Sequence, residues 1–353
     1  MSQRTAIVFF NLGGPDGPDD VRPFLKNLFS DKAIIRAPAP VRFFLSRLIS
    51  STRAASARAN YAKMGGGSPL LKETRAQAVA LEAALAARGH QARVFIAMRY
   101  WKPYASQTAR EVAAWAPDKV ILLPLYPQLS TTTTLSSVKA WTEAGGKCDR
   151  LICCYPTQEG FIESHMRRIM EAWEKGGRPG NVRVLLSAHG LPETVIRDGD
   201  PYQWQVEATA AEVRRRLPAE WEMQVCYQSR VGPLKWIGPP TDDAVRRAAG
   251  DGKSILLCPV AFVSEHIETL VELDEEYREL AHEAGASVFM RAEALGVEPG
   301  FIGALANLVE DALADEDPSP IRSHCGGRIC PGGQRRCPNQ RACTQAVKED
   351  AHV

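Results

Sequence analysis

The chain has 353 residues, of which 24% are charged and 45% hydrophobic, and its 43 Lys and Arg residues nearly balance its 41 Asp and Glu residues. This composition excludes a disordered, collagen-like or disulfide-stapled chain. The net charge of +2 gives no field that would draw nucleic acid to the whole surface. The longest apolar runs are well short of the roughly 20 residues that a membrane span needs, and we expect no cleaved leader. The sequence therefore predicts a cytoplasmic globular protein of two domains and a remainder, without a nucleic-acid partner.

The first half of the chain alternates short apolar runs with amphipathic helical segments, which predicts a parallel sheet covered on both faces. The predicted strands are 6–11, 93–98, 120–125 and 151–155. The predicted helices are 68–88, 106–115, 133–144 and 160–175. Ser68 and Pro69 would open the first of these helices as the N-cap and the first helical residue.

The segment 33–52 differs from these units because it has no strand beside it. It joins apolar side chains to arginines: Phe43, Phe44, Leu45, Leu48 and Ile49 with Arg36, Arg42 and Arg47. Such a basic, apolar helix is typical of a lid or of an element at an interface. The alternative is an ordinary amphipathic helix that packs on the first domain.

After a glycine-rich break at 176–180 the same pattern begins again. The predicted strands are 182–187, 222–227, 254–259 and 287–291, and the predicted helices are 203–216, 242–249, 266–283 and 300–313. The chain thus indicates an α/β fold of two Rossmann-like doubly wound lobes, each with a four-stranded parallel sheet, that face each other across a cleft. We expect an N-terminal lobe at 1–175, a C-terminal lobe at 176–318 and a short Cys-rich tail at 319–353. Functional residues should follow the strands, since ligands bind beyond the carboxyl ends of such sheets.

Three loops of the first lobe carry candidate binding residues. The first strand ends in the turn 11–15, where two glycines permit close approach of a ligand. Three glycines at 65–67 precede a predicted helix, an arrangement that suits an anion, although a flexible connector is the alternative. The second strand runs into Arg99 and Tyr100. An arginine can hold a carboxylate in a bidentate pair, and aromatic rings can stack on a flat ligand.

In the second lobe the strand ends carry histidine, tryptophan and glutamate. His189 ends an apolar strand and is followed by glycine, although a lone histidine is more often structural. Trp236 lies in a loop so rich in Gly and Pro that it could form the wall of a pocket. His266 and Glu268 open a predicted helix. Its later glutamates could belong to the same site, or they could simply form an acidic face exposed to solvent. Because the first and third strands are often neighbours, His189 and Glu268 could meet and there bind a divalent transition metal or move protons.

Nine cysteines are many for a cytoplasmic chain. Five of them lie in or beside apolar segments and would be small buried hydrophobes: Cys148, Cys153, Cys154, Cys226 and Cys258. Four lie in the tail without the C-x-x-C pair of a zinc finger: Cys325, Cys330, Cys337 and Cys343. The composition of the tail cannot bury a core, so it should become ordered only around a metal centre. A zinc site and unliganded thiols are the alternatives.

Together these segments closely resemble the ferrochelatases, which insert ferrous iron into a porphyrin in haem synthesis. The matching pieces run in the family's order over about residues 6–320: NLGGP, GGGSP, MRY, YPQ, SAHGLP with GDPY, QSRVGP followed by Trp236, and AFVSEHIETLVELD. The resemblance implies insertion of Fe²⁺ into protoporphyrin IX with release of two protons, the terminal step of haem synthesis. The rivals are a coproporphyrin ferrochelatase or cobaltochelatase of the same architecture, and a non-catalytic carrier of haem or iron.

The resemblance also implies roles for single residues. His189 and Glu268 would be the catalytic pair that meets the iron and the pyrrole protons, with His266 and Glu272 behind them as an acidic path. The porphyrin would be bound by Leu12, Ser68, Arg99, Tyr100 and Trp236. The segment 35–50 would be a lip over the porphyrin pocket that could touch the inner membrane, and a homodimer is a further expectation.

For the tail, the resemblance implies a [2Fe–2S] cluster as cofactor. Some ferrochelatases hold such a cluster with three tail cysteines and one internal cysteine, but the matching helix at 160–166 has no cysteine here. We therefore assign the ligands to the four tail cysteines, which suffice for a cluster. The alternative is that an internal cysteine replaces one of them.

Overall fold

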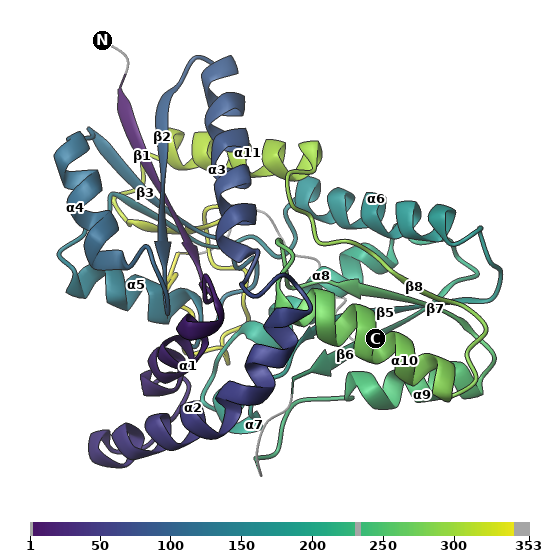
Figure 1. Ribbon diagram of the computed structural model, residues 1–353. Coiled ribbons are helices and arrows are strands. Elements are labelled where there is room, and N and C mark those ends of the chain that lie inside the picture. Colours follow the sequence, from purple (N-terminus) through teal and green to yellow (C-terminus); the bar gives the residue numbers. More distant parts are fainter. Residues whose placement is uncertain (1–2, 230–233, 342–353) are drawn as a thin grey trace. The chain divides into compact units, whose positions relative to one another are not determined.

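The computed structural model describes residues 3–229 and 234–341. The chain divides into two compact units, the first made of Met1–Leu125 and Ser130–Leu151 and the second of Tyr126–Leu129 and Ile152–Val353 (Figure 1). The division falls within a strand, β4 (Arg150–Cys154). In the described part of the chain, no helix is long and apolar enough to cross a membrane.

The first unit is built on parallel strands that include β1 (Arg4–Asn11), β2 (Gln91–Met98) and β3 (Lys119–Pro124). Every residue of β1 after Arg4 is buried, as expected for a central strand covered on both faces. Its other elements are η1 (Pro18–Asp20), α1 (Val21–Ser30), α2 (Ala39–Ala62), α3 (Leu70–Ala87), α4 (Ala105–Trp115) and α5 (Thr134–Glu143). The strand order of this sheet is β2-β1-β3-β4-β9.

The second unit holds a four-stranded parallel sheet in the order β6-β5-β7-β8. Its strands are β5 (Val182–His189), β6 (Glu222–Gln228), β7 (Ser254–Pro259) and β8 (Phe289–Arg291). Its helices are α6 (Glu159–Lys175), α7 (Glu193–Arg197), α8 (Tyr202–Arg214), α9 (Thr241–Gly250), the π-helix η2 (Glu268–Glu276), α10 (Tyr277–Glu283) and α11 (Pro299–Ala314).

Successive residues of β7 show how this sheet is covered on both faces. Leu257 packs in a core with residues of α9 and α10, while the thiol of its neighbour Cys258 lies 3.7 Å from His165 Nδ1 of α6. Because side chains alternate along a strand, α6 and α9 cover opposite faces. This explains why β7 is continuously apolar. Helix α6, which the sequence placed in the first lobe, packs on α8 and α11 of the second unit.

The α/β class, the eight predicted strands and their parallel pairing are confirmed. The expectation of two four-stranded sheets needs one correction, since the first sheet gains a fifth strand, β9 (Ile321–Ser323), from the tail. Just after β9, His324 N donates a hydrogen bond to Cys154 O (3.0 Å), so the tail satisfies main-chain groups beside β4. A three-residue strand of this kind has no periodicity that a sequence pattern could reveal.

The observed helix limits differ from the predicted ones near prolines. The helix expected at 33–52 is α2, which begins only at Ala39, because Pro38 is its N-cap and Pro40 occupies its first turn. Similarly α3 begins at Leu70 with Pro69 rather than Ser68 as its N-cap. Helices α1 and α7 were not predicted. The helix expected at 266–283 is the π-helix η2 followed by α10, and such wide turns are frequent at functional sites.

Candidate active site

Three loops of the first unit meet at the carboxyl ends of β1 and β2. Tyr100 N donates a hydrogen bond to Leu12 O (2.9 Å), which joins the loop after β2 to the loop after β1. Ser68 N donates to Pro15 O (2.8 Å), which joins the glycine-rich loop to the same turn. Gly14 is required there, since a Cβ at this position would lie 2.4 Å from Ser68 Cβ. Leu12, Ser68 and Tyr100, singled out separately in the sequence, are thus neighbours.

Arg99 is already paired with a carboxylate of the chain, because Asp31 accepts a hydrogen bond from its guanidinium (Nη2 to Oδ2, 2.7 Å). The same carboxylate oxygen accepts from Tyr100 Oη (2.8 Å) and Ser136 Oγ (2.5 Å), and Arg99 Nε donates to Ser136 Oγ (2.7 Å). Burial alone would raise the pKa of Asp31, but these partners and the main-chain N–H of Ala33 outweigh it and lower the pKa. Asp31 was missed because no motif surrounds it in the sequence.

In the second unit His189 ends β5 with its ring held in one tautomer. Its Nδ1 lies 2.6 Å from Gly190 O, and since a carbonyl oxygen only accepts, Nδ1 carries the proton. In the neutral ring the lone pair is therefore on Nε2, which is the atom that can accept a proton or meet a metal ion.

Glu268 and His189 both lie within electrostatic reach of His266. Burial lowers the pKa of His266, the charge of Glu268 opposes this shift, and the charge of His189 adds to it. One carboxylate oxygen of Glu268, Oε2, is buried and has no hydrogen-bond partner among the described residues. The structure therefore brings together His189, His266 and Glu268 at the carboxyl ends of β5 and β7.

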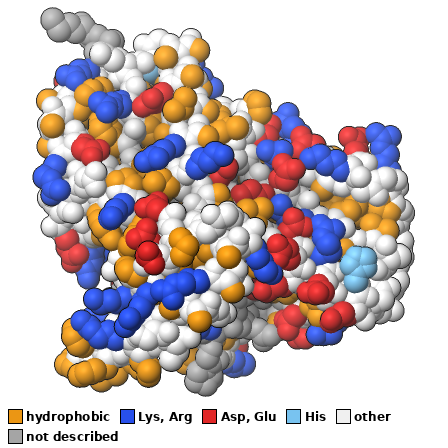
Figure 2. Space-filling model, in the orientation of Figure 1, with side chains coloured by type: hydrophobic (Ala, Val, Ile, Leu, Met, Phe, Trp, Pro, Cys, Tyr) orange, Lys and Arg blue, Asp and Glu red, His pale blue; other side chains and the backbone are white. Residues whose placement is uncertain are grey.

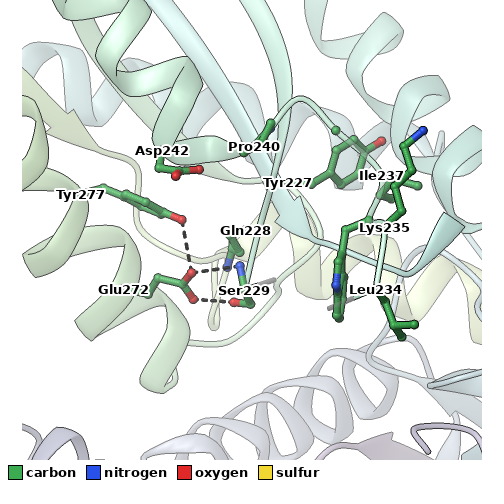
Figure 3. A pocket seen from close by; sticks show the side chains of 12 residues that line it. Tyr227, Gln228, Ser229, Leu234, Lys235, Ile237, Pro240, Asp242, Glu272 and Tyr277 are labelled. Atoms are coloured by element: carbon green, nitrogen blue, oxygen red, sulfur yellow. Dashed lines mark hydrogen bonds between the residues drawn. The ribbon is translucent and has the colours of Figure 1, made fainter. Parts of the chain in front are cut away.

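A cavity of about 660 Å³ in the same unit is lined by Glu272, which Figure 3 shows, and by Trp236. The carboxylate of Glu272 accepts hydrogen bonds from Ser229 N (3.0 Å), Ser229 Oγ (2.5 Å) and Tyr277 Oη (3.2 Å). The Trp236 indole N–H is buried without a partner in the described chain. Both predicted residues therefore lie at one pocket, although residues 230–233 of the same loop lie outside the described residues.

The sequence matches one protein family over most of its length. The family model for ferrochelatase matches residues 4–313. A ferrochelatase from Caulobacter vibrioides (strain NA1000 / CB15N) is 61% identical over 342 residues, which are 96% of this chain and 98% of the relative. A ferrochelatase from Hyphomonas neptunium is 58% identical over 342 residues, or 96% of this chain and 95% of the relative. The chain belongs to the ferrochelatase family.

The solved structure of SirB from Bacillus subtilis with Fe³⁺ shares the fold. Its TM-score is 0.51 at 14% identity, over 88% of this chain and 96% of SirB. Family membership makes this chain a metal chelatase of the lyase class, which inserts iron into a porphyrin in the terminal step of haem synthesis. The lobes predicted from the sequence are those of a chelatase fold.

Beyond the chelatase core, the tail packs against a strand that carries two thiols. Cys154 lies beside Cys153 (Sγ to Sγ, 3.7 Å), and the pKa of Cys154 is raised by this contact, by burial and by the charge of Cys337. A hydrogen bond with Cys337 and burial raise the pKa of Cys330, while the same bond lowers the pKa of Cys337 to about 7. Cys330, Cys337 and Cys154 are thus neighbours, and Cys154 is an internal thiol that the sequence did not single out.

The other two predicted ligands are Cys325 and Cys343. Cys325 Sγ is 3.3 Å from Ser323 Oγ, and Cys343 lies outside the described residues. Across residues 3–229 and 234–341 there is no set of three or more His, Cys, Asp or Glu side chains arranged to hold a metal ion.

Helix α2 of this ferrochelatase exposes large apolar side chains beside arginines. Phe44 is 69% exposed and Leu48 61%, and Phe43 lies under the guanidinium of Arg47 at 3.3 Å from ring centroid to Cζ. Figure 2 shows hydrophobic and basic side chains gathered at its lower left, where Figure 1 has α2. The basic, apolar helix predicted from the sequence is confirmed, without the buried face of an ordinary amphipathic helix along its first turns.

Proposed function

We propose that this ferrochelatase acts on protoporphyrin IX, and that His189 and Glu268 receive the pyrrole protons as ferrous iron enters the ring. The observation that carries the proposal is the presence of two acceptors within electrostatic reach of His266: His189 Nε2, and Glu268 Oε2, which is buried without a hydrogen-bond partner among the described residues. Leu12, Ser68, Arg99, Tyr100 and Trp236 would bind the porphyrin, and His266 and Glu272 would form a path for protons or iron.

The chemistry of insertion explains why these groups are needed. A flat porphyrin directs its nitrogen lone pairs into the ring and keeps two N–H protons. A pocket that favours a bent macrocycle exposes the lone pairs, which is differential binding of the transition state. The two protons then need acceptors, and a neutral histidine with its lone pair on Nε2 is one. Glu268 would take the second proton or guide the metal ion.

Purified protein supplied with ferrous iron and protoporphyrin IX tests the proposal, with coproporphyrin in a parallel reaction. We expect protohaem to form over many turnovers and protoporphyrin to be preferred. A preference for coproporphyrin would overturn the substrate assignment. Tight binding of porphyrin without turnover would instead identify a carrier.

We further propose that the tail thiols hold a [2Fe–2S] cluster. The buried, mutually hydrogen-bonded thiols of Cys330 and Cys337 support this fit, because thiolates are the ligands of such clusters. Cys325 and Cys343 complete the set from the tail. Cys154 is the alternative fourth ligand, since it neighbours both buried tail thiols. The cluster would stabilise the tail, and the iron insertion itself needs no electron transfer.

Metal and sulfide analysis of Cys→Ser variants distinguishes these ligand sets. We expect two irons and two acid-labile sulfides per chain, lost in Cys330→Ser and Cys337→Ser. Loss in Cys343→Ser with retention in Cys154→Ser supports the tail set, and the reverse assigns Cys154. One zinc and no sulfide would refute the cluster.

Finally, we propose that α2 and the segment before it touch an anionic membrane surface as the lip of the porphyrin site. Exposed phenylalanines beside arginines suit such a surface. The protein should sediment with vesicles of anionic lipid more than with neutral ones. Phe44→Ser should reduce the fraction of protein that sediments with anionic vesicles. Equal sedimentation of the parent protein and Phe44→Ser would contradict the proposal.

A further inference from the structure

The tail touches the loop that leads into α8. Arg336 N donates a hydrogen bond to Gly199 O (2.9 Å). Gly199 has φ +89°, and a Cβ at this position would lie 2.7 Å from Arg335 N. Only glycine allows both this conformation and this approach of the tail main chain.

A second contact lies one turn into α8. Gln205 is fully buried, its Oε1 accepts from Leu129 N (2.7 Å), and its Nε2 donates to Cys330 Sγ (3.1 Å). The tail thus contacts the chain on both sides of the start of α8, through Gly199 before it and Gln205 after it.

Tyr202 is the first residue of α8 and lies between these two contacts. Its N–H donates to the buried carboxylate of Asp200 (3.0 Å), and its ring is buried. Burial and the nearby charge of Glu268 raise the pKa of its hydroxyl, while a hydrogen bond with the main chain of His189 acts in the opposite direction. Tyr202 therefore lies beside the main chain of His189 and within electrostatic reach of Glu268, the pair to which we assign the proton transfer.

We propose that the tail segment 330–337 is an internal docking element that positions Tyr202 beside His189 and Glu268, with Gly199 and Gln205 as its positioning residues. This inference rests on the proposed roles of His189 and Glu268. It requires no particular metal, because both contacts are made by the chain itself.

The sharpest test compares Gly199→Ala with Gly285→Ala. Gly285 has nearly the same φ, +87°, but no described residue comes within 4 Å of a Cβ there, so both variants share the backbone strain and only Gly199→Ala displaces the tail. We expect kcat for iron insertion to fall about tenfold to a hundredfold in Gly199→Ala, with KM for porphyrin changed less than about twofold. Gly285→Ala should keep the kcat of the parent chain.

The tail thiols give a readout that does not depend on activity. In the protein as purified, they should react faster with a thiol reagent in Gly199→Ala than in Gly285→Ala. If Gly199→Ala fails to fold, Gln205→Met replaces it as the test variant. Methionine keeps the length of the side chain but cannot make the two hydrogen bonds of the Gln205 carboxamide, to Leu129 N and to Cys330 Sγ. Gln203→Met is its control, since the Gln203 amide donates a hydrogen bond to Glu207 on the same helix (2.9 Å) and to no tail residue in the described part of the chain.

Equal kcat in the test and control variants would overturn the inference, as would faster thiol reaction with unchanged kcat. A fall in kcat confined to Gly199→Ala and Gln205→Met supports it. The two proposals fail separately: an active His189→Ala protein refutes the assigned catalytic pair, whereas an inactive His189→Ala beside a fully active Gly199→Ala refutes only the docking role.

Discussion

Arg99 Nη2 and Asp31 Oδ2 lie 2.7 Å apart and join the loop after β2 to the residue that follows α1. Asp31 also begins the stretch that leads to α2, where its main-chain oxygen accepts from Ile34 N and Ile35 N. The pair therefore ties the start of the proposed lip to the strand-end loops. A porphyrin carboxylate that binds Arg99 has to share the guanidinium with Asp31.

Asp31→Asn should destabilise the protein. The amide cannot replace a carboxylate that accepts three side-chain hydrogen bonds at one oxygen, and leaving such buried donors without an acceptor costs about 1–3 kcal/mol. Thermal unfolding of the variant should begin at a lower temperature than that of Asp19→Asn, an exposed control. Equal midpoints would show that the network contributes little.

His189→Ala should abolish iron insertion and leave the fold intact. The ring is only half-buried at the end of β5, so little packing is lost, whereas removal of a general base typically costs about 10²–10⁴ in rate. Turnover and porphyrin binding are measured on the same preparation, and circular dichroism checks the fold. Near-normal turnover by the folded variant would end the catalytic assignment.

Glu268→Gln should reduce turnover far more than porphyrin affinity. The amide keeps the shape of the side chain but no longer accepts a proton at Oε2. Glu276→Gln serves as the matched control, because Glu276 is exposed on the same helix η2. The assignment is wrong if porphyrin binding weakens while the bound porphyrin is metallated at the normal rate.

His165 should make the protein less stable in mild acid. It is 1% exposed, and burial lowers its pKa from 6.5 to about 3. Between these values the unfolded chain binds a proton that the folded chain does not, so the free energy of unfolding falls as the pH drops below 6.5.

We expect His165→Leu to remove about 2 kcal/mol of this fall between pH 6.5 and 5. Denaturant unfolding at several pH values measures the slope, with His282→Leu as the control, since His282 is exposed. Identical slopes in the parent and His165→Leu proteins would show that the buried imidazole is not the group responsible.

The sequence was informative wherever periodicity or a strand end carried the signal. Continuous apolar runs predicted the parallel strands, and the rule that ligands bind after strands selected His189, Arg99 and Glu268. Asp31 and Cys154 were not selected. Their importance depends on neighbours more than 60 residues away along the chain, Arg99 for Asp31 and Cys337 for Cys154, and no local pattern encodes such pairs.

The widened turns of η2 were also beyond sequence reasoning. A stretch such as ETLVELDEE has ordinary helical spacing, and a change from α to π hydrogen bonding leaves no compositional trace. The fold class therefore followed from local pattern, while the details that orient the candidate site followed from tertiary contacts.

Strand β9 covers the edge of the first sheet that β4 would otherwise form. It lies at the outer end of the sheet beside β4, where main-chain groups would otherwise face solvent as an open edge. Unpaired edges of this kind recruit strands from other molecules and seed aggregates. A chain cut before Ile321 would uncover the apolar strand that carries Cys153 and Cys154, and we expect such a chain to aggregate more readily than the full-length chain.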